Sequence, residues 1–137
     1  MLPMRSLPLS LFLVFVLIVG CSHNDIEHNK GLEKSIYSMV KDRTNKEIEV
    51  NSIADFKWDK AYLFEPYSTE EHIEKQLGVE YEDPSNISSR DDIYLLVFLN
   101  EGKVVQYAEI NRQKGNFSTG GKEYLSPSED GLKIERQ

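Results

Sequence analysis

The sequence predicts an α+β fold in which a small antiparallel sheet has two helices packed on one face. Two segments, residues 31–43 and 68–78, carry apolar residues at the spacing of a helix face. A third segment, residues 93–99, is apolar at every position, as in a central strand covered on both sides. The predicted order is helix, strand, helix, strand, strand and a weaker strand, and this order favours the α+β class.

The first helix is predicted from the recurrence of apolar residues every three or four positions. Leu32, Ile36, Met39 and Val40 share one face, and the polar pair Thr44-Asn45 interrupts the pattern. We therefore expect a helix over residues 31–43.

The second helix is predicted from its two ends. Ser68 and Glu71 have the spacing of a capping box, in which each side chain accepts from the backbone N–H of the other residue. Ile73 and Leu77 then share a face, and Gly78 supplies the left-handed residue that ends a helix. A short helix over residues 68–78 follows.

An aromatic strand is predicted between the helices. Residues 56–64 alternate in part, which places Phe56, Trp58, Tyr62 and Phe64 on one side of a strand that Pro66 ends. These aromatics are either core or, where Trp58, Tyr62 or Tyr67 is exposed, the anchors of a partner-binding surface.

The remaining strands follow the polar segment 79–92, which is expected to be an exposed connection. Residues 93–99 form the central strand, residues 100–102 a tight turn, and residues 103–110 the returning strand. A further hairpin is expected around residues 126–131, with Tyr124-Leu125 facing Leu132 and Ile134.

Length, charge and cysteine content exclude several classes of protein. The 137 residues suffice for one domain, and the 16 Lys and Arg against 23 Asp and Glu give a net charge of −7. No dense basic run is present, so no nucleic acid is expected as a partner. A single Cys excludes an internal disulfide and cysteine-based zinc sites.

The N-terminus has the layout of a secretory signal. Arg5 precedes nine apolar residues in succession, Leu11–Val19, a run too short to cross a bilayer comfortably. The residues Ile18-Val19-Gly20-Cys21 at its end resemble the lipobox of bacterial lipoproteins. An uncleaved anchor, or a signal cut elsewhere with an incidental Cys21, is the alternative.

The lipobox resemblance implies that Cys21 receives a diacylglyceryl group and that residues 1–20 are removed. The mature chain is then tied to the membrane, and two acyl chains suffice for stable anchoring. Residues 21–30 are expected to be the lipidated N-terminus and a flexible tether, and residues 31–137 a single α+β domain.

Candidate chemistry is sparse. The cluster His23, Asp25, Glu27 and His28 offers metal ligands, but nothing orders it, so a solvated linker is preferred and no metal site is expected. His72 is the single His of the predicted domain, and no nucleophile motif accompanies it. No catalytic residue and no cofactor are predicted, and the Gly-rich segment 115–123 fails as a phosphate loop because Glu123 replaces the magnesium-binding hydroxyl.

The segment Lys57–Tyr67, the Glu-rich helix ending Leu77-Gly78 and the lipobox together resemble a group of small, largely uncharacterised lipoproteins of Bacillus-type bacteria. The order of elements is also similar to the α+β fold of β-lactamase-inhibitor-like and outer-membrane-assembly lipoproteins. Neither resemblance implies catalytic residues.

These observations predict a non-enzymatic, lipid-anchored binding module on the outer face of the cell membrane, with a protein or another envelope component as its partner. The alternative is a small envelope hydrolase or ligand-binding lipoprotein. A binding module is expected to display Trp58, Tyr62 or Tyr67 on an open surface, whereas an enzyme would gather His72 with carboxylates in a cleft.

Overall fold

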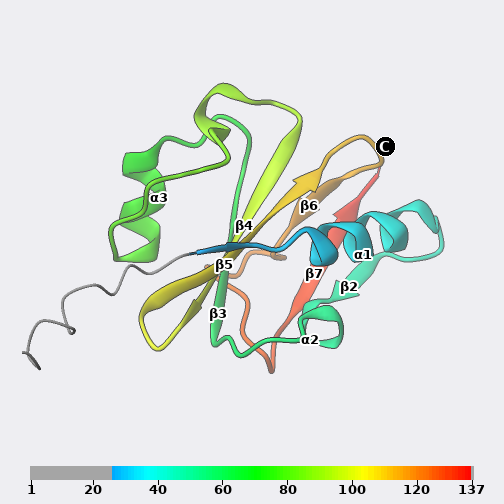
Figure 1. Ribbon diagram of the computed structural model, residues 1–137. Coiled ribbons are helices and arrows are strands. Elements are labelled where there is room, and N and C mark those ends of the chain that lie inside the picture. Colours follow the sequence, from blue (N-terminus) through cyan, green and yellow to red (C-terminus); the bar gives the residue numbers. More distant parts are fainter. Residues whose placement is uncertain (1–25, 137) are drawn as a thin grey trace, which may run out of the picture.

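The computed structural model describes residues 26–136, and these residues form an α+β fold, as predicted. Four strands make one sheet in the order β1-β5-β4-β3, and three make a second sheet in the order β2-β7-β6 (Figure 1). All pairings are antiparallel except that of β1 with β5. The strands are β1 (Glu27–His28), β2 (Glu47–Glu49), β3 (Lys60–Phe64), β4 (Ile93–Asn100), β5 (Lys103–Asn111), β6 (Asn116–Ser118) and β7 (Gly131–Glu135), and the helices are α1 (Lys30–Lys41), α2 (Val50–Ile53), α3 (Glu70–Leu77) and the 3-10 turn η2 (Ile87–Ser89).

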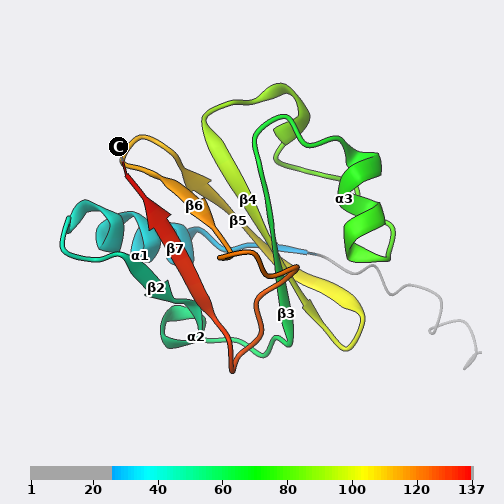
Figure 2. The same ribbon diagram turned by 180° about the vertical axis from the view of Figure 1, so that it is seen from behind.

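The two main helices lie on opposite faces of the four-stranded sheet, so the prediction that both pack on one face is wrong (Figures 1 and 2). The buried face of α1 joins a core cluster with the even-numbered residues of β4, whereas α3 joins a second cluster with the odd-numbered residues. Successive side chains of a strand point to opposite faces, and every residue from Ile93 to Leu99 is buried. Both faces of β4 therefore need a cover, and one helix supplies each.

The hairpin of β4 and β5 is confirmed. Glu101 and Gly102 have φ values of +51° and +77°, the positive pair that a two-residue type I′ turn requires. This turn brings Leu99 opposite Val104 and lets β5 return along β4 to Asn111.

Both predicted helices are present with shifted starts. Asn29 caps α1, with its side chain accepting from the Leu32 N–H at 2.9 Å. The α3 cap is Thr69 rather than Ser68, because the Thr69 hydroxyl accepts from the His72 N–H, while the Ser68 hydroxyl donates to the Glu65 carbonyl. Gly78 ends α3 at φ +77°, as predicted.

The aromatic segment 56–64 is not one continuous strand face. Phe56 and Trp58 pack in the cluster beneath α1, whereas Tyr62 and Phe64 lie in the cluster beneath α3. Regular pairing with β4 starts only at Lys60, so the chain preceding it is free to turn its aromatic side chains to the other face.

The tight turn expected around residues 126–131 is present, because Ser126 and Glu129 form an antiparallel bridge, but the residues on either side of it have other partners than predicted. Leu125 bridges to Ala61 of β3, and Gly131–Glu135 forms β7 between β2 and β6. Leu125, Leu132 and Ile134 do share the cluster beneath α1.

The domain begins earlier than predicted. Glu27 and His28 pair with Gln106 and Tyr107 of β5, so these two residues belong to the sheet and not to a flexible tether. Within residues 26–136, no helix is long and apolar enough to cross a membrane.

Candidate functional site

The lipobox and Cys21 lie outside the described residues, as do His23 and Asp25.

Of the three candidate aromatics, Trp58 and Tyr62 are core residues. Trp58 packs edge-on against Phe98, with ring centroids 5.4 Å apart, and donates its indole N–H to Asn51 Oδ1 at 3.2 Å. Tyr62 stacks beside Phe64 under α3. Neither offers an open surface to a partner.

Tyr67 is the exposed aromatic. Its side chain is 60% accessible, and among residues 26–136 it is the one large apolar residue that is exposed. Its backbone is in the left-handed region at φ +67°, a conformation that costs a non-glycine residue of order 1 kcal/mol. Its N–H donates to the carbonyls of both Ile87 and Arg90, at 3.0 and 3.2 Å, and these bonds hold the strained backbone.

The chain that holds Tyr67 is itself tightly ordered. The Asp83 carboxylate accepts from the Ser85 N–H, the Ser85 hydroxyl and the Ile87 N–H, at 2.6 to 2.9 Å. Ser85 and Ile87 are buried, and Asn86 between them has φ +56°. The segment 79–92, expected to be a plain exposed connection, is therefore a built loop around one carboxylate.

Arg90 closes this loop from the other side. Its guanidinium donates to the Ser85 carbonyl at 3.1 Å and to Glu109 Oε1 at 2.8 Å, and it pairs with both carboxylate oxygens of Asp92 at 2.9 Å. The hydrogen bonds from Arg90 hold the pKa of Asp92 below its usual range. We call Tyr67 with its supports Asp83, Ser85, Ile87 and Arg90 the Tyr67 platform.

A chain of polar contacts links the platform to the start of the domain. Glu109 lies between Arg90 and His28, whose Nε2 is 3.7 Å from Glu109 Oε2 and 2.6 Å from Glu33 Oε2. Glu33 Oε2 also accepts from the Glu109 N–H at 2.7 Å. This side chain thus bonds a backbone group of β5 that lies beyond the end of its pairing with β1. The His28 ring stacks on Tyr107 at 4.5 Å.

His28 thus contacts Glu33, five residues along the chain, and the distant residues Tyr107 and Glu109 of β5, rather than the acidic residues beside it. Glu27 is exposed, and within residues 26–136 no group of three or more His, Cys, Asp and Glu side chains is arranged to hold a metal ion. The sequence signal for this cluster is slight, because Glu33 and Glu109 resemble any other surface carboxylate of an acidic chain.

His72 lies on α3 with an exposed side chain, its ring edge-on to Phe64 at 6.1 Å. Among residues 26–136, no hydrogen bond or ion pair joins the His72 ring to a carboxylate. His72 lines neither the groove beside the end of α3 nor the groove between α1 and β5.

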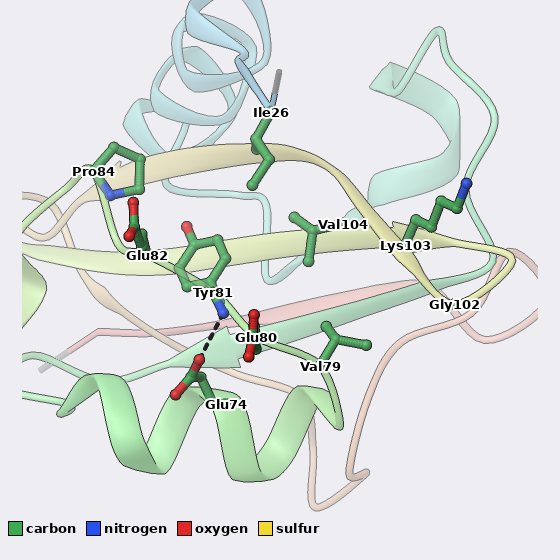
Figure 3. Close-up of a pocket in the computed structure, with 10 residues that line it drawn as sticks. All are labelled: Ile26, Glu74, Val79, Glu80, Tyr81, Glu82, Pro84, Gly102, Lys103 and Val104. Atoms are coloured by element: carbon green, nitrogen blue, oxygen red, sulfur yellow. Dashed lines mark hydrogen bonds between the residues drawn. The ribbon is translucent and has the colours of Figure 1, made fainter. Parts of the chain in front are cut away.

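The first groove, of about 790 Å³, runs between the end of α3 and the turn from β4 to β5, and we call it the α3–β5 groove (Figure 3). Its walls combine apolar side chains with three carboxylates. The residues that line it include Ile26, Glu74, Val79, Glu80, Tyr81, Glu82, Lys103 and Val104. A second groove, of about 530 Å³, lies between α1 and the end of β5 and is lined by Tyr37, Lys41 and Arg90 among others.

Tyr81 is the unusual residue of the α3–β5 groove. Its side chain is 3% exposed, and its hydroxyl has no hydrogen-bond partner among the described residues. Burial, and to a lesser degree the nearby Asp83 carboxylate, raises the pKa of this phenol well above its usual range. A buried hydroxyl without a partner costs free energy on folding.

We predict that Tyr81→Phe raises the free energy of unfolding at pH 7 by about 1 kcal/mol, because it removes a hydroxyl that is desolvated without compensation. Above pH 10 the unfolded chain releases the Tyr81 proton while the folded chain retains it, so stability falls as pH rises. Tyr81→Phe has no such proton to release. Its free energy of unfolding should therefore escape the fall of about 1.4 kcal/mol per pH unit that Tyr81 causes in the wild type.

Urea titrations at pH 7 and between pH 10 and 11.5 measure both effects. The matched control Tyr67→Phe, at an exposed position, should change the unfolding free energy at pH 7 by less than about 0.5 kcal/mol. A loss of stability in Tyr81→Phe at pH 7 would contradict the assignment of an uncompensated hydroxyl.

Comparison of the chain with protein-family models, with curated proteins and with solved structures finds no match.

Proposed function

We propose that this protein is a lipid-anchored binding module of the outer face of the cell membrane, held by a diacylglyceryl group on Cys21 and contacting a protein or envelope partner through Tyr67. The observation that carries the proposal is the Tyr67 platform, which presents one exposed aromatic on a rigid support. Tyrosine is enriched among residues that dominate binding interfaces, and a support ordered in advance lowers the entropy lost on binding.

The position of Tyr67 relative to the sheet supports an outward-facing role. The described chain starts at Ile26, which lies in one groove with Gly102 and Val104 at the turn from β4 to β5. Tyr67 instead contacts the carbonyls of Ile87 and Arg90, just before β4 begins. The eight residues of β4 separate these two ends by roughly 26 Å.

An anchor at Cys21 is therefore attached to one end of the sheet, and Tyr67 lies at the other. From Cys21 to Ile26 the chain has five residue steps, which span at most roughly 18 Å. The domain is then held close to the bilayer with Tyr67 directed away from it. This arrangement suits contact with another envelope component better than contact with the lipid surface.

The test places a photo-crosslinking amino acid at position 67 of the full-length protein in intact membranes. We expect a discrete crosslinked protein, and we expect the same substitution at Tyr37, a half-buried tyrosine on α1, not to give that product. Cys21→Ala should lose the lipid label and move the protein from the membrane to the soluble fraction.

Two results would contradict the proposal. Retention of Cys21→Ala in the membrane with unchanged mobility excludes lipidation at this residue. Copurification of a small molecule, with no protein crosslinked from position 67, favours the ligand-binding or hydrolase alternative instead.

A further inference from the structure

The α3–β5 groove lies apart from the Tyr67 platform and has a floor and a rim of different chemistry. The apolar floor comes from two sides, because Ile26, just before β1, and Val104 of β5 face Val79 and Tyr81 of the segment after α3 (Figure 3). Ile26, Val79 and Val104 are each only half-buried, so apolar surface remains open to a ligand.

The rim of the groove is acidic. Glu74, Glu80 and Glu82 line it against one cation, Lys103. Glu74 accepts from the Tyr81 N–H at 2.8 Å, which fixes the carboxylate beside the floor. Glu80 and Glu82 are exposed, and their charge is open to pairing with a ligand. A ligand that fits this rim carries positive charge.

The lack of a hydrogen-bond partner for the Tyr81 hydroxyl among the described residues is a separate observation that points to a ligand. The hydroxyl is buried, it has no hydrogen-bond partner among residues 26–136, and Figure 3 shows it directed along the groove wall between Pro84 and Ile26. A backbone group of a ligand that reached this hydroxyl would provide the missing hydrogen bond. An apolar floor, an acidic rim and an unpaired hydroxyl together suit a peptide better than a metal ion or a small sugar.

We propose that the α3–β5 groove binds a cationic amphipathic peptide. An apolar side chain of the peptide packs on Ile26, Val79 and Val104, while its Lys or Arg residues pair with Glu80 and Glu82. The Tyr81 hydroxyl takes a hydrogen bond with the peptide backbone.

The source of the peptide follows from the place of the groove. Ile26, the residue through which the chain leads back to Cys21, is part of the groove wall. With the lipid anchor of the proposed function, the groove lies within roughly 18 Å of the bilayer. Cationic amphipathic peptides concentrate at this surface because anionic lipids attract them and their apolar face enters the interface. The position of the groove near the bilayer rests on the proposed function, whereas binding of the peptide to the groove does not.

The experiment measures fluorescence anisotropy of a labelled 14-residue peptide of Leu and Lys at helical spacing, added to the full-length protein in non-ionic detergent. We expect saturable binding that the double variant Glu80→Gln/Glu82→Gln weakens about tenfold. Val79→Ser and Tyr81→Phe should each weaken it several-fold. Glu49→Gln/Glu129→Gln, which removes two exposed carboxylates outside the groove, should change it less than twofold.

Equal weakening by the two double variants would overturn the proposal, because binding would then follow overall charge. Equal binding of a Leu and Gln peptide would overturn it as well, because the acidic rim would play no part. Circular dichroism establishes that each variant is folded. Cys21→Ala should bind the peptide like the wild type. The experiment therefore distinguishes failure of the lipid-anchor proposal from failure of the groove proposal.

Discussion

Replacement of Phe98 by alanine is expected to lower the free energy of unfolding by about 3–5 kcal/mol, the largest effect we expect from a single substitution. Phe98 of β4 is fully buried in the core cluster beneath α1. Its ring meets Phe56 and Trp58 edge-on, at centroid distances of 4.9 and 5.4 Å. Truncation leaves a cavity that these two rings, attached to different parts of the chain, cannot both fill.

Equilibrium denaturation in urea, followed by circular dichroism, measures this loss. Phe98→Leu keeps most of the apolar volume and should cost less than half as much, whereas Tyr37→Ala, at a half-buried position on α1, should cost less again. A loss below about 1.5 kcal/mol for Phe98→Ala would show that the cluster beneath α1 is not packed as described.

Arg90→Ala is expected to lower the free energy of unfolding by about 2 kcal/mol. It removes donors from the Ser85 carbonyl, Glu109 and Asp92, and it leaves Glu109 without its cation. The side chains of Arg90 and Glu109 are 31% and 19% exposed, so the effect lies between that of a surface pair and that of a buried one. Amide exchange at Tyr67 should also become faster, because the loop that supports it loosens.

The control is Lys133→Ala. Its ion pair with Glu47 is 3.5 Å long and about half exposed on both sides, so the cost should stay below about 0.5 kcal/mol. Equal losses in the two variants would mean that Arg90 is an ordinary surface residue and that the Tyr67 platform is not rigid.

The effect of Arg90→Ala should also depend on pH. The hydrogen bonds from Arg90 lower the pKa of Asp92 from its ordinary value of 3.8, so this stabilisation is present above that pH and is lost as pH falls through the folded-state pKa. The difference between wild type and variant in urea titrations should therefore narrow below about pH 4.

Local patterns predicted the elements that depend on neighbouring residues. The apolar spacing of Leu32, Ile36 and Val40 predicted α1, and Gly78 predicted the end of α3. Both signals are local, because helix periodicity and a left-handed helix end depend on a few successive residues. The uniformly apolar run from Ile93 to Leu99 likewise indicated a strand covered on both faces. The three-residue strand β2 was missed, since Ile48 is its one buried residue and shows no period.

The candidate site was predicted in part. Tyr67 was named with Trp58 and Tyr62, and the structure exposes Tyr67 while it buries the other two. No sequence pattern distinguished them, because all three are aromatic residues within ten positions. Arg90 and Glu109 were not singled out, since they meet only when the hairpin of β4 and β5 brings Glu109 back beside the loop before β4.

The sequence by itself determined the α+β class, the single-domain size, the acidic charge and most of the regular elements, because these follow from composition and from short-range periodicity. Only the tertiary structure decided that the helices cover opposite faces, that His28 joins Glu33 and Glu109, and that Tyr67 remains in solvent. These outcomes depend on which distant surfaces pack together. A side chain is buried when another segment covers it, and the segment that covers it is chosen by the whole fold.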